Sequence, residues 1–177
     1  MASSSCCIGL LSLVVLLPFL LVSASATKYI DAICQRTSTT HKAFCVKTLN
    51  AYPSAASATS TFQAAGATLN LAISYAHRYA VFAGKVAKEN PKLKKDFATI
   101  QDAFMTISMS LKSAKLELKD SPDTANYDVM VCTDSTMIVK NLIGKNTDKV
   151  SKTVMLMTLK MEKLLAMAVG ATVAVGG

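Results

Sequence analysis

The sequence predicts an all-α protein, an antiparallel four-helix bundle with a small disulfide-clamped helical hairpin at its N-terminal end. Three observations predict it. Apolar residues recur at alternating steps of four and three over long stretches, which places them on one face of a helix. Proline, glycine and short polar clusters separate these stretches, so the connections are short. The chain is rich in alanine, lysine, leucine and methionine and contains no tryptophan. Four such stretches joined by short loops favour an antiparallel bundle.

The first 26 residues have the pattern of a secretory signal peptide. They contain no charged side chain, carry an apolar run over residues 8–22, and end in Ala24-Ser25-Ala26, which fits the A-x-A cleavage pattern. The usual Lys or Arg near the start is missing. An uncleaved anchor is the alternative, although about fifteen apolar residues are short for a bilayer span. We therefore expect a secreted domain of residues 27–177 that has no membrane association after cleavage.

Three cysteines remain in this domain, and they could be metal ligands, a redox pair or a structural bridge. A zinc site needs about four ligands, and Cys34, Cys45 and Cys132 are supplemented only by His41 and His77, without clustered spacing. A redox pair favours C-x-x-C. In a secretory route, cysteine pairs usually form disulfides. The sequence thus predicts a Cys34–Cys45 bridge that clamps a turn between two short helices. Cys132 is expected to pack as a buried free thiol, with intermolecular pairing or thiol reactivity as the alternative.

The first two bundle helices are predicted over residues 61–89 and from Asn90-Pro91 to the cluster Asp120-Ser121-Pro122-Asp123. Asn90 is a capping residue and Pro91 suits the first helical position, and the second cluster ends the helix. The predicted inner-face residues are Phe62, Leu69, Ile73, Ala76, Ala80 and Ala83 in the first helix, and Leu93, Phe97, Ile100, Phe104, Ile107, Leu111, Ala114 and Leu118 in the second.

The third helix is expected to follow this cluster and to close on Gly144, a natural residue beyond a helix end. The fourth begins near Thr147-Asp148, and we interpret residues 166–177 as its frayed terminus. The predicted inner-face residues are Val129, Cys132, Thr136, Val139 and Ile143 in the third helix, and Val150, Val154, Met157, Met161, Leu164 and Ala168 in the fourth.

Catalytic residues are scarce. The two histidines lie on different segments, and the eleven Asp and Glu residues are scattered, so no nucleophile–base pair or metal set is recognisable. The G-x-S-x-G, H-E-x-x-H and P-loop patterns are absent from the sequence. The sequence therefore predicts a protein that is not an enzyme, needs no cofactor and acts by binding.

The charge is strongly basic. The net charge is +8 at pH 7, residues 1–26 contribute none of it, and the densest basic run is KVAKENPKLKKD at residues 85–96. Solvated helix ends account for such a run, and attraction to polyanions is the alternative. Nucleic acid is not expected as a partner, because a secretory signal precedes the domain.

Several stretches together resemble a known family. They are Ile30 with Cys34, FCVKTLNAYPSA at residues 44–55, LNLAIS at 69–74, NPKLKKDFATIQDAF at 90–104 and KLLAMA at 163–168. In their layout and in the position of the first cysteine pair, they resemble the plant invertase inhibitor and pectin methylesterase inhibitor family. The resemblance implies a helical bundle and a secreted inhibitor in the plant cell wall.

The chain departs from the pattern of this family at a second disulfide. The resemblance implies one cysteine near Ile100 and its partner between Met137 and Asn141, and neither is present. The connection at residues 144–147 is also shorter than is usual in the family. The chain is therefore identified as a divergent member.

The resemblance implies that the protein inhibits pectin methylesterase by reversibly occluding its cleft as a 1:1 complex. Inhibition of a cell-wall or vacuolar invertase is the alternative. Relatives of that type carry Pro-Lys-Phe between the third and fourth bundle helices. Here Pro122-Asp123-Thr124 matches that element only in its proline, and Asp120, Ser121, Pro122 and Asp123 form the possible target-contact loop. A non-inhibitory structural protein of the cell wall is a further alternative. The basic surface could also associate weakly with pectin.

Overall fold

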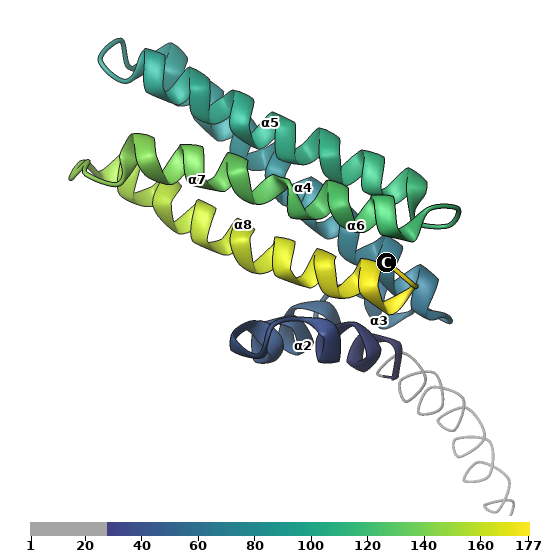
Figure 1. The fold of residues 1–177 in the computed structure, drawn as a ribbon. Coiled ribbons are helices and arrows are strands. Elements are labelled where there is room, and N and C mark those ends of the chain that lie inside the picture. Colours follow the sequence, from purple (N-terminus) through teal and green to yellow (C-terminus); the bar gives the residue numbers. More distant parts are fainter. Residues whose placement is uncertain (1–27) are drawn as a thin grey trace, which may run out of the picture.

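The structure, a computed structural model, describes residues 28–177 and confirms the all-α prediction (Figure 1). The described part consists of helices and their connections, without a strand. The predicted signal peptide lies outside the described residues. Among the described helices, none combines the length and hydropathy that crossing a membrane requires.

The N-terminal part is a helical hairpin, as predicted. Residues 28–36 are helical, a 3₁₀ turn η1 (Thr39–His41) follows, and α2 (Lys42–Asn50) runs back. Cys34 and Cys45 are fully buried and disulfide-bonded, with their Cα atoms 5.6 Å apart. A bridge that closes so short a loop stabilises the fold by about 3 kcal/mol in the chain-entropy treatment. The short helix α3 (Pro53–Ala56) then leads into the bundle.

The bundle has four corners, as predicted. They are occupied by α4 (Thr61–Glu89), α5 (Lys94–Glu117), the pair α6 (Pro122–Met130) and α7 (Cys132–Ile143), and α8 (Lys149–Ala174). The helix α4 contacts α5 and α8, and the pair α6 and α7 contacts the same two helices from the other side. The hairpin packs on α8 and, through α3, is joined to α4 (Figure 1). Most of the predicted inner-face residues are buried in one continuous core.

Side-chain caps fix two helix starts. The Ser60 hydroxyl accepts a hydrogen bond from the Gln63 N–H at 3.1 Å at the start of α4. Asp148 accepts from the N–H groups of Val150 and Ser151 at the start of α8. Ser and Asp are preferred at this position because they satisfy helix N–H groups that lack a carbonyl partner. The predicted start of the fourth helix is therefore confirmed.

The predicted start of the second helix is wrong by a few residues. Asn90 is the C-cap of α4, and α5 begins only at Lys94. The Asn90 side chain accepts from the Lys92 N–H, and its carbonyl accepts from the Leu93 N–H. Asn90 and Pro91 thus form a turn that reverses the chain, because an Asn side chain readily bonds to backbone two residues on.

The third bundle helix is broken, which its uninterrupted apolar pattern did not predict. At the break the Asp134 N–H donates to the carbonyl of Val131 rather than to that of Met130. The Met130 carbonyl accepts instead from the Thr133 hydroxyl at 2.8 Å. A hydroxyl that satisfies a freed carbonyl lowers the cost of such a break.

The third helix closes on Gly144 as predicted, with this residue as the C-cap of α7 at φ −59°. Two further expectations are wrong in detail. Residues 166–174 are ordered helix within α8, because their small side chains allow close packing, and Met167, Ala168 and Ala171 are fully buried. Phe62 lies on the outside of α4 and is 45% exposed, because the start of α4 packs through Ala64 and Ala65.

Candidate functional site

Large apolar side chains lie on the outer face of the third bundle helix. Tyr127, Met130 and Met137 are 65%, 54% and 55% exposed. With the exposed residues Asp134 and Asn141 they recur at steps of three and four, so they form one stripe along α6 and α7. We call this set the outer stripe. Exposed apolar residues gathered on one face indicate a surface that binds a partner, and methionine adapts its shape to different contacts.

The neighbouring helix α5 also exposes apolar side chains. Met109 and Leu116, seven residues apart and so on one face, are 58% and 82% exposed. The helix α5 contacts both α6 and α7, and Figure 1 shows α5 on the side of the bundle that faces away from the hairpin. This side of the bundle therefore offers two adjacent helices with exposed apolar residues to a protein partner.

The possible target-contact loop lies at one end of these helices. The structure places Asp120 and Ser121 in the connection between α5 and α6, and Pro122 and Asp123 in the first turn of α6. This connection joins the second and third bundle helices, so the match to an element between the third and fourth helices is wrong; residues 144–148 form that connection. Asp120, Ser121 and Asp123 are exposed. A negative side chain in the first turn is favourable, because the N-terminal end of a helix carries partial positive charge. The connection itself covers residues 118–121, so it lies two residues earlier than the sequence indicated.

The C-terminal end of the chain packs next to this loop. The Thr172 hydroxyl of α8 bonds to the side-chain oxygen of Asn126 in α6 at 2.9 Å. The Gly177 N–H donates back to the carbonyl of Thr172. Sequence reasoning missed this contact because it joins residues 46 positions apart. It fixes the orientation of α6, and with it the start of the outer stripe.

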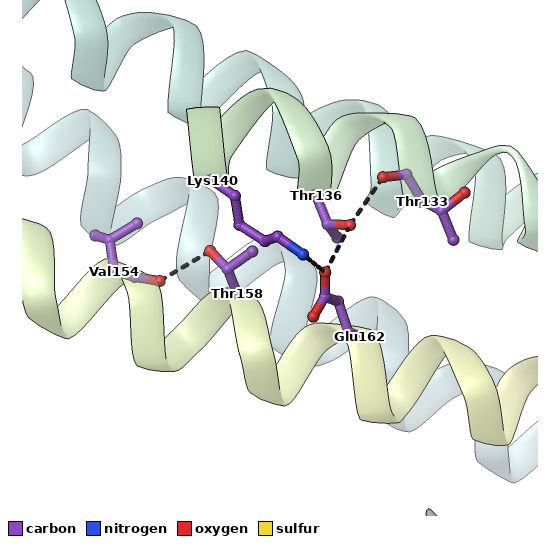
Figure 2. A network of polar contacts seen from close by, with 6 residues as sticks. All are labelled: Thr133, Thr136, Lys140, Val154, Thr158 and Glu162. Carbon is purple, nitrogen blue, oxygen red and sulfur yellow. Dashed lines mark hydrogen bonds and ion pairs between the residues drawn. The ribbon is translucent and has the colours of Figure 1, made fainter. Parts of the chain in front are cut away.

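A polar network joins α7 to α8 (Figure 2). Lys140 Nζ donates to Glu162 Oε1 at 2.8 Å, and the Thr136 hydroxyl lies 3.4 Å from the same oxygen. The Lys140 and Glu162 side chains are 40% and 28% exposed, so water screens the pair only in part. A hydrogen bond between charged groups is stronger than one between neutral groups. This one holds α7 against α8 at a point away from the loop that joins them.

Cys132 is buried at the start of α7, as the sequence predicts. Its Sγ donates to the carbonyl of Asp128 at 3.3 Å, and it is the free cysteine of the described part of the chain. Burial raises the pKa of this thiol to about 12. Since the thiolate is the reactive form, the thiol is inert in the folded protein.

The histidines occupy separate places: His41 lies in η1 and His77 is exposed on α4. Over residues 28–177, no group of three or more His, Cys, Asp and Glu side chains is arranged to hold a metal ion.

The family model of plant invertase/pectin methylesterase inhibitors matches residues 28–154, from the hairpin to the first turns of α8. No curated protein and no solved structure is significantly similar to the chain.

Proposed function

We propose that this chain, which belongs to the plant invertase/pectin methylesterase inhibitor family, is a secreted inhibitor of pectin methylesterase in the plant cell wall. Proteins of this family inhibit one of these two enzymes and are not enzymes themselves. The bundle would bind the esterase as a 1:1 complex and occlude its pectin cleft reversibly. Residues 1–26 would be removed as the signal peptide, which leaves residues 27–177 as the inhibitory domain.

The observation that carries the mode of action is the outer stripe. An inhibitor that acts by covering a cleft needs a rigid surface with large side chains that can enter the cleft. Aromatic residues and methionine are enriched in the cores of protein interfaces. Tyr127, Met130 and Met137 supply such side chains on a helix that is held on its inner face by Val129 and Val139. Because the helix is packed on both neighbours, little conformational freedom is lost on binding.

Invertase is the second candidate target, through the loop at the start of α6. Asp120, Ser121 and Asp123 are exposed there and could reach a partner. The sequence contains no Pro-Lys-Phe element, either at Pro122 or in the connection of residues 144–148 between the third and fourth bundle helices, and this favours the esterase. A structural protein of the cell wall without inhibitory activity is the remaining alternative, since the second disulfide of the family is absent.

A titration with both enzymes tests the proposal. The purified protein, with its Cys34–Cys45 bridge intact, is added to a plant pectin methylesterase and to an acid invertase at about pH 5. We expect reversible loss of esterase activity that reaches completion near one equivalent at micromolar concentration, which requires a dissociation constant well below micromolar and so a binding free energy clearly above about 8 kcal/mol. Inhibition of the invertase alone would favour the second target. Binding to neither enzyme would favour the structural role.

A further inference from the structure

A groove between the hairpin and the bundle has the features of a ligand site. It holds about 420 Å³ and is open to solvent at one side. One wall comes from α2, with Phe44 and Lys47; the other comes from Tyr75 of α4 and Lys160 of α8. Apolar walls with a few polar groups are typical of small-molecule sites. The lining residues come from α2, the connection that follows it, α4 and α8, and none comes from α5.

Of the two cations that line the groove, Lys47 and Lys160, aromatic contact positions Lys160, and two cations outside the lining, Arg78 and Lys163, also lie over its rings. Lys160 Nζ lies 4.2 Å from the centre of the Tyr75 ring and donates to its hydroxyl at 3.0 Å. The guanidinium of Arg78 lies 4.3 Å from the centre of the same ring, and Lys163 Nζ lies 5.5 Å from that of Phe44. Cations are attracted to the faces of aromatic rings, and this attraction orients their side chains. The hydrogen bond from Lys160 also lowers the pKa of the Tyr75 hydroxyl.

These cations are not neutralised by the protein. The ion pairs of residues 28–177 are Lys85–Glu89 and Lys140–Glu162, so Lys47, Arg78 and Lys160 have no carboxylate within 4.0 Å. A salt bridge would place a carboxylate where a ligand must bind, whereas an aromatic ring positions the cation and leaves its charge available. An ammonium group has three N–H donors, and Lys160 uses one of them on Tyr75.

We propose that this groove binds a carboxylate-bearing oligosaccharide, an oligouronide, with Lys160 and Lys47 contacting its carboxylates. An acidic sugar fits the lining, because its carboxylate meets the ammonium groups, its hydroxyls bond to Thr48 and Tyr75, and its apolar faces pack on Phe44 and Leu71. The choice of a uronide rests on the proposed function: pectin methylesterase converts esterified uronides to free carboxylates. The inhibitor would thereby be retained on the product of the enzyme that it inhibits.

The groove and the outer stripe lie on different parts of the bundle, so both can be occupied at once. The groove is lined by α2, α4 and α8, whereas the stripe lies on α6 and α7. Loss of oligosaccharide binding should therefore leave enzyme inhibition unchanged. This separation allows the two proposals to fail independently.

The test is a calorimetric titration with a short oligogalacturonide whose carboxyl groups are free, compared with the same oligomer as its methyl ester. We expect the free acid to bind at least about tenfold more tightly than the ester. The double variant Lys47→Met/Lys160→Met should weaken binding of the acid by about tenfold or more. The matched control Lys112→Met/Lys145→Met removes the same charge from exposed sites outside the groove, and its affinity should stay within about twofold of the unaltered protein.

Several outcomes would overturn the proposal. Equal weakening in the two variants would show diffuse attraction to the basic surface, and equal binding of acid and ester would remove the role of the carboxylate. Competition by polyglutamate as strong as that by the oligouronide would identify an acidic protein segment as the occupant. The acid–ester comparison uses the unaltered protein, so it remains decisive if the groove variant does not fold. Each variant is also assayed for esterase inhibition, which should not change.

Discussion

Gly170 of α8 lies against the backbone carbonyl of Ile33 in the hairpin. A Cβ atom at Gly170 would stand 2.8 Å from this carbonyl oxygen and 2.5 Å from Oγ1 of Thr37. Atoms at such distances overlap, so the hairpin docks on α8 only because this position lacks a side chain. The disulfide closes the hairpin, and the absence of a side chain at Gly170 allows the hairpin to pack closely on α8.

Gly170→Ala should therefore destabilise the protein. The Thr37 side chain can rotate away from a new Cβ atom. The Ile33 carbonyl cannot, because it belongs to the helix of residues 28–36, and this helix would have to move as a unit. We expect a loss of about 1–3 kcal/mol in the free energy of unfolding, as in other overpacked cores. Denaturant unfolding followed by circular dichroism measures it.

Gly66 provides the matched control. It also lies within a long helix, but a Cβ atom there would have nothing within 4 Å. Gly66→Ala should raise the free energy of unfolding by about 0.5–1 kcal/mol, because alanine favours the helix. Equal effects of the two substitutions would contradict the close approach at Gly170.

The second prediction concerns Cys132. In the protein without residues 1–26, an alkylating reagent used near pH 8 without reductant should label no thiol in the folded state and one after unfolding. The reason is burial, which raises the pKa of the thiol to about 12 and shields it from the reagent. Mass spectrometry after proteolysis locates the label. Label on Cys34 or Cys45 would contradict the disulfide.

The same burial makes stability depend on alkaline pH. The Cys132 thiol has a higher pKa in the folded state than the ordinary value of 9.0, so the unfolded state loses its proton first. The contribution of this group to the free energy of unfolding is fully present below about pH 9 and is lost as the pH rises towards 12. Tyr79, whose pKa burial raises to about 12, acts in the same direction above pH 10. Cys132→Ala should reduce the loss of stability over this range.

The buried faces of the helices could be predicted from the sequence, because they depend on the periodicity of apolar residues. Phe97, Ile100, Phe104 and Ile107 recur at steps of three and four and are all fully buried in α5. The break at Val131 was missed because the apolar pattern continues through it: Val129 and Cys132 are both buried on either side. The Thr133 hydroxyl bonds to the backbone carbonyl of Met130 at the break, and a hydropathy pattern does not report such a bond.

The groove could not be predicted, because its contacts join distant segments. Tyr75 and Lys160 are 85 positions apart, and nothing in either local sequence indicates that they meet. The exposure of the outer stripe could not be predicted for a different reason. The inner face predicted for the third helix excludes Tyr127, Met130 and Met137, but periodicity does not report how much of each side chain the neighbouring helices leave exposed.

The third prediction concerns the disulfide that is missing from the family pattern. Cys132 Sγ lies 4.0 Å from the carbonyl of Ile107. The helices α5 and α7 are antiparallel. Two turns back along α5 from Ile107 and two turns on along α7 from Cys132 therefore bring Ile100 opposite Val139. Both side chains are fully buried, whereas the neighbours Met137, Ile138 and Asn141 are exposed. Within the window from Met137 to Asn141, Val139 is therefore the position for a partner cysteine.

Ile100→Cys combined with Val139→Cys should form a bond between α5 and α7. A bridge that closes about forty residues contributes around 4 kcal/mol in the chain-entropy treatment, although the smaller side chains lose packing. The control Ile100→Cys/Val139→Ala carries the same packing loss without the bond. We expect the bonded variant to melt several degrees above this control. An equal melting temperature with the bond formed would show that the bundle already restricts the unfolded chain at this point.

The fourth prediction tests the loop at the start of α6. Replacing Asp123 and Thr124 by Lys and Phe recreates the Pro-Lys-Phe order after Pro122. If the loop contacts invertase, inhibition of that enzyme should strengthen and esterase inhibition should not change. The replacement of a first-turn carboxylate by a cation costs stability, about 0.5 kcal/mol, which a melting curve accounts for. Unchanged invertase inhibition in a folded variant would remove this loop from the candidate contacts.

The fifth prediction tests the outer stripe as the surface that occludes the esterase. Met130→Glu and Met137→Glu should each weaken inhibition by about tenfold or more, since a carboxylate must then lose its hydration at the centre of the interface. Leu156→Glu is the matched control, because Leu156 is 69% exposed on α8 and lies outside the stripe. All three positions are exposed, so the folded state should tolerate each change. Measured inhibition constants decide the outcome. If Leu156→Glu weakens inhibition and the two stripe variants do not, the esterase binds the outer face of α8 instead.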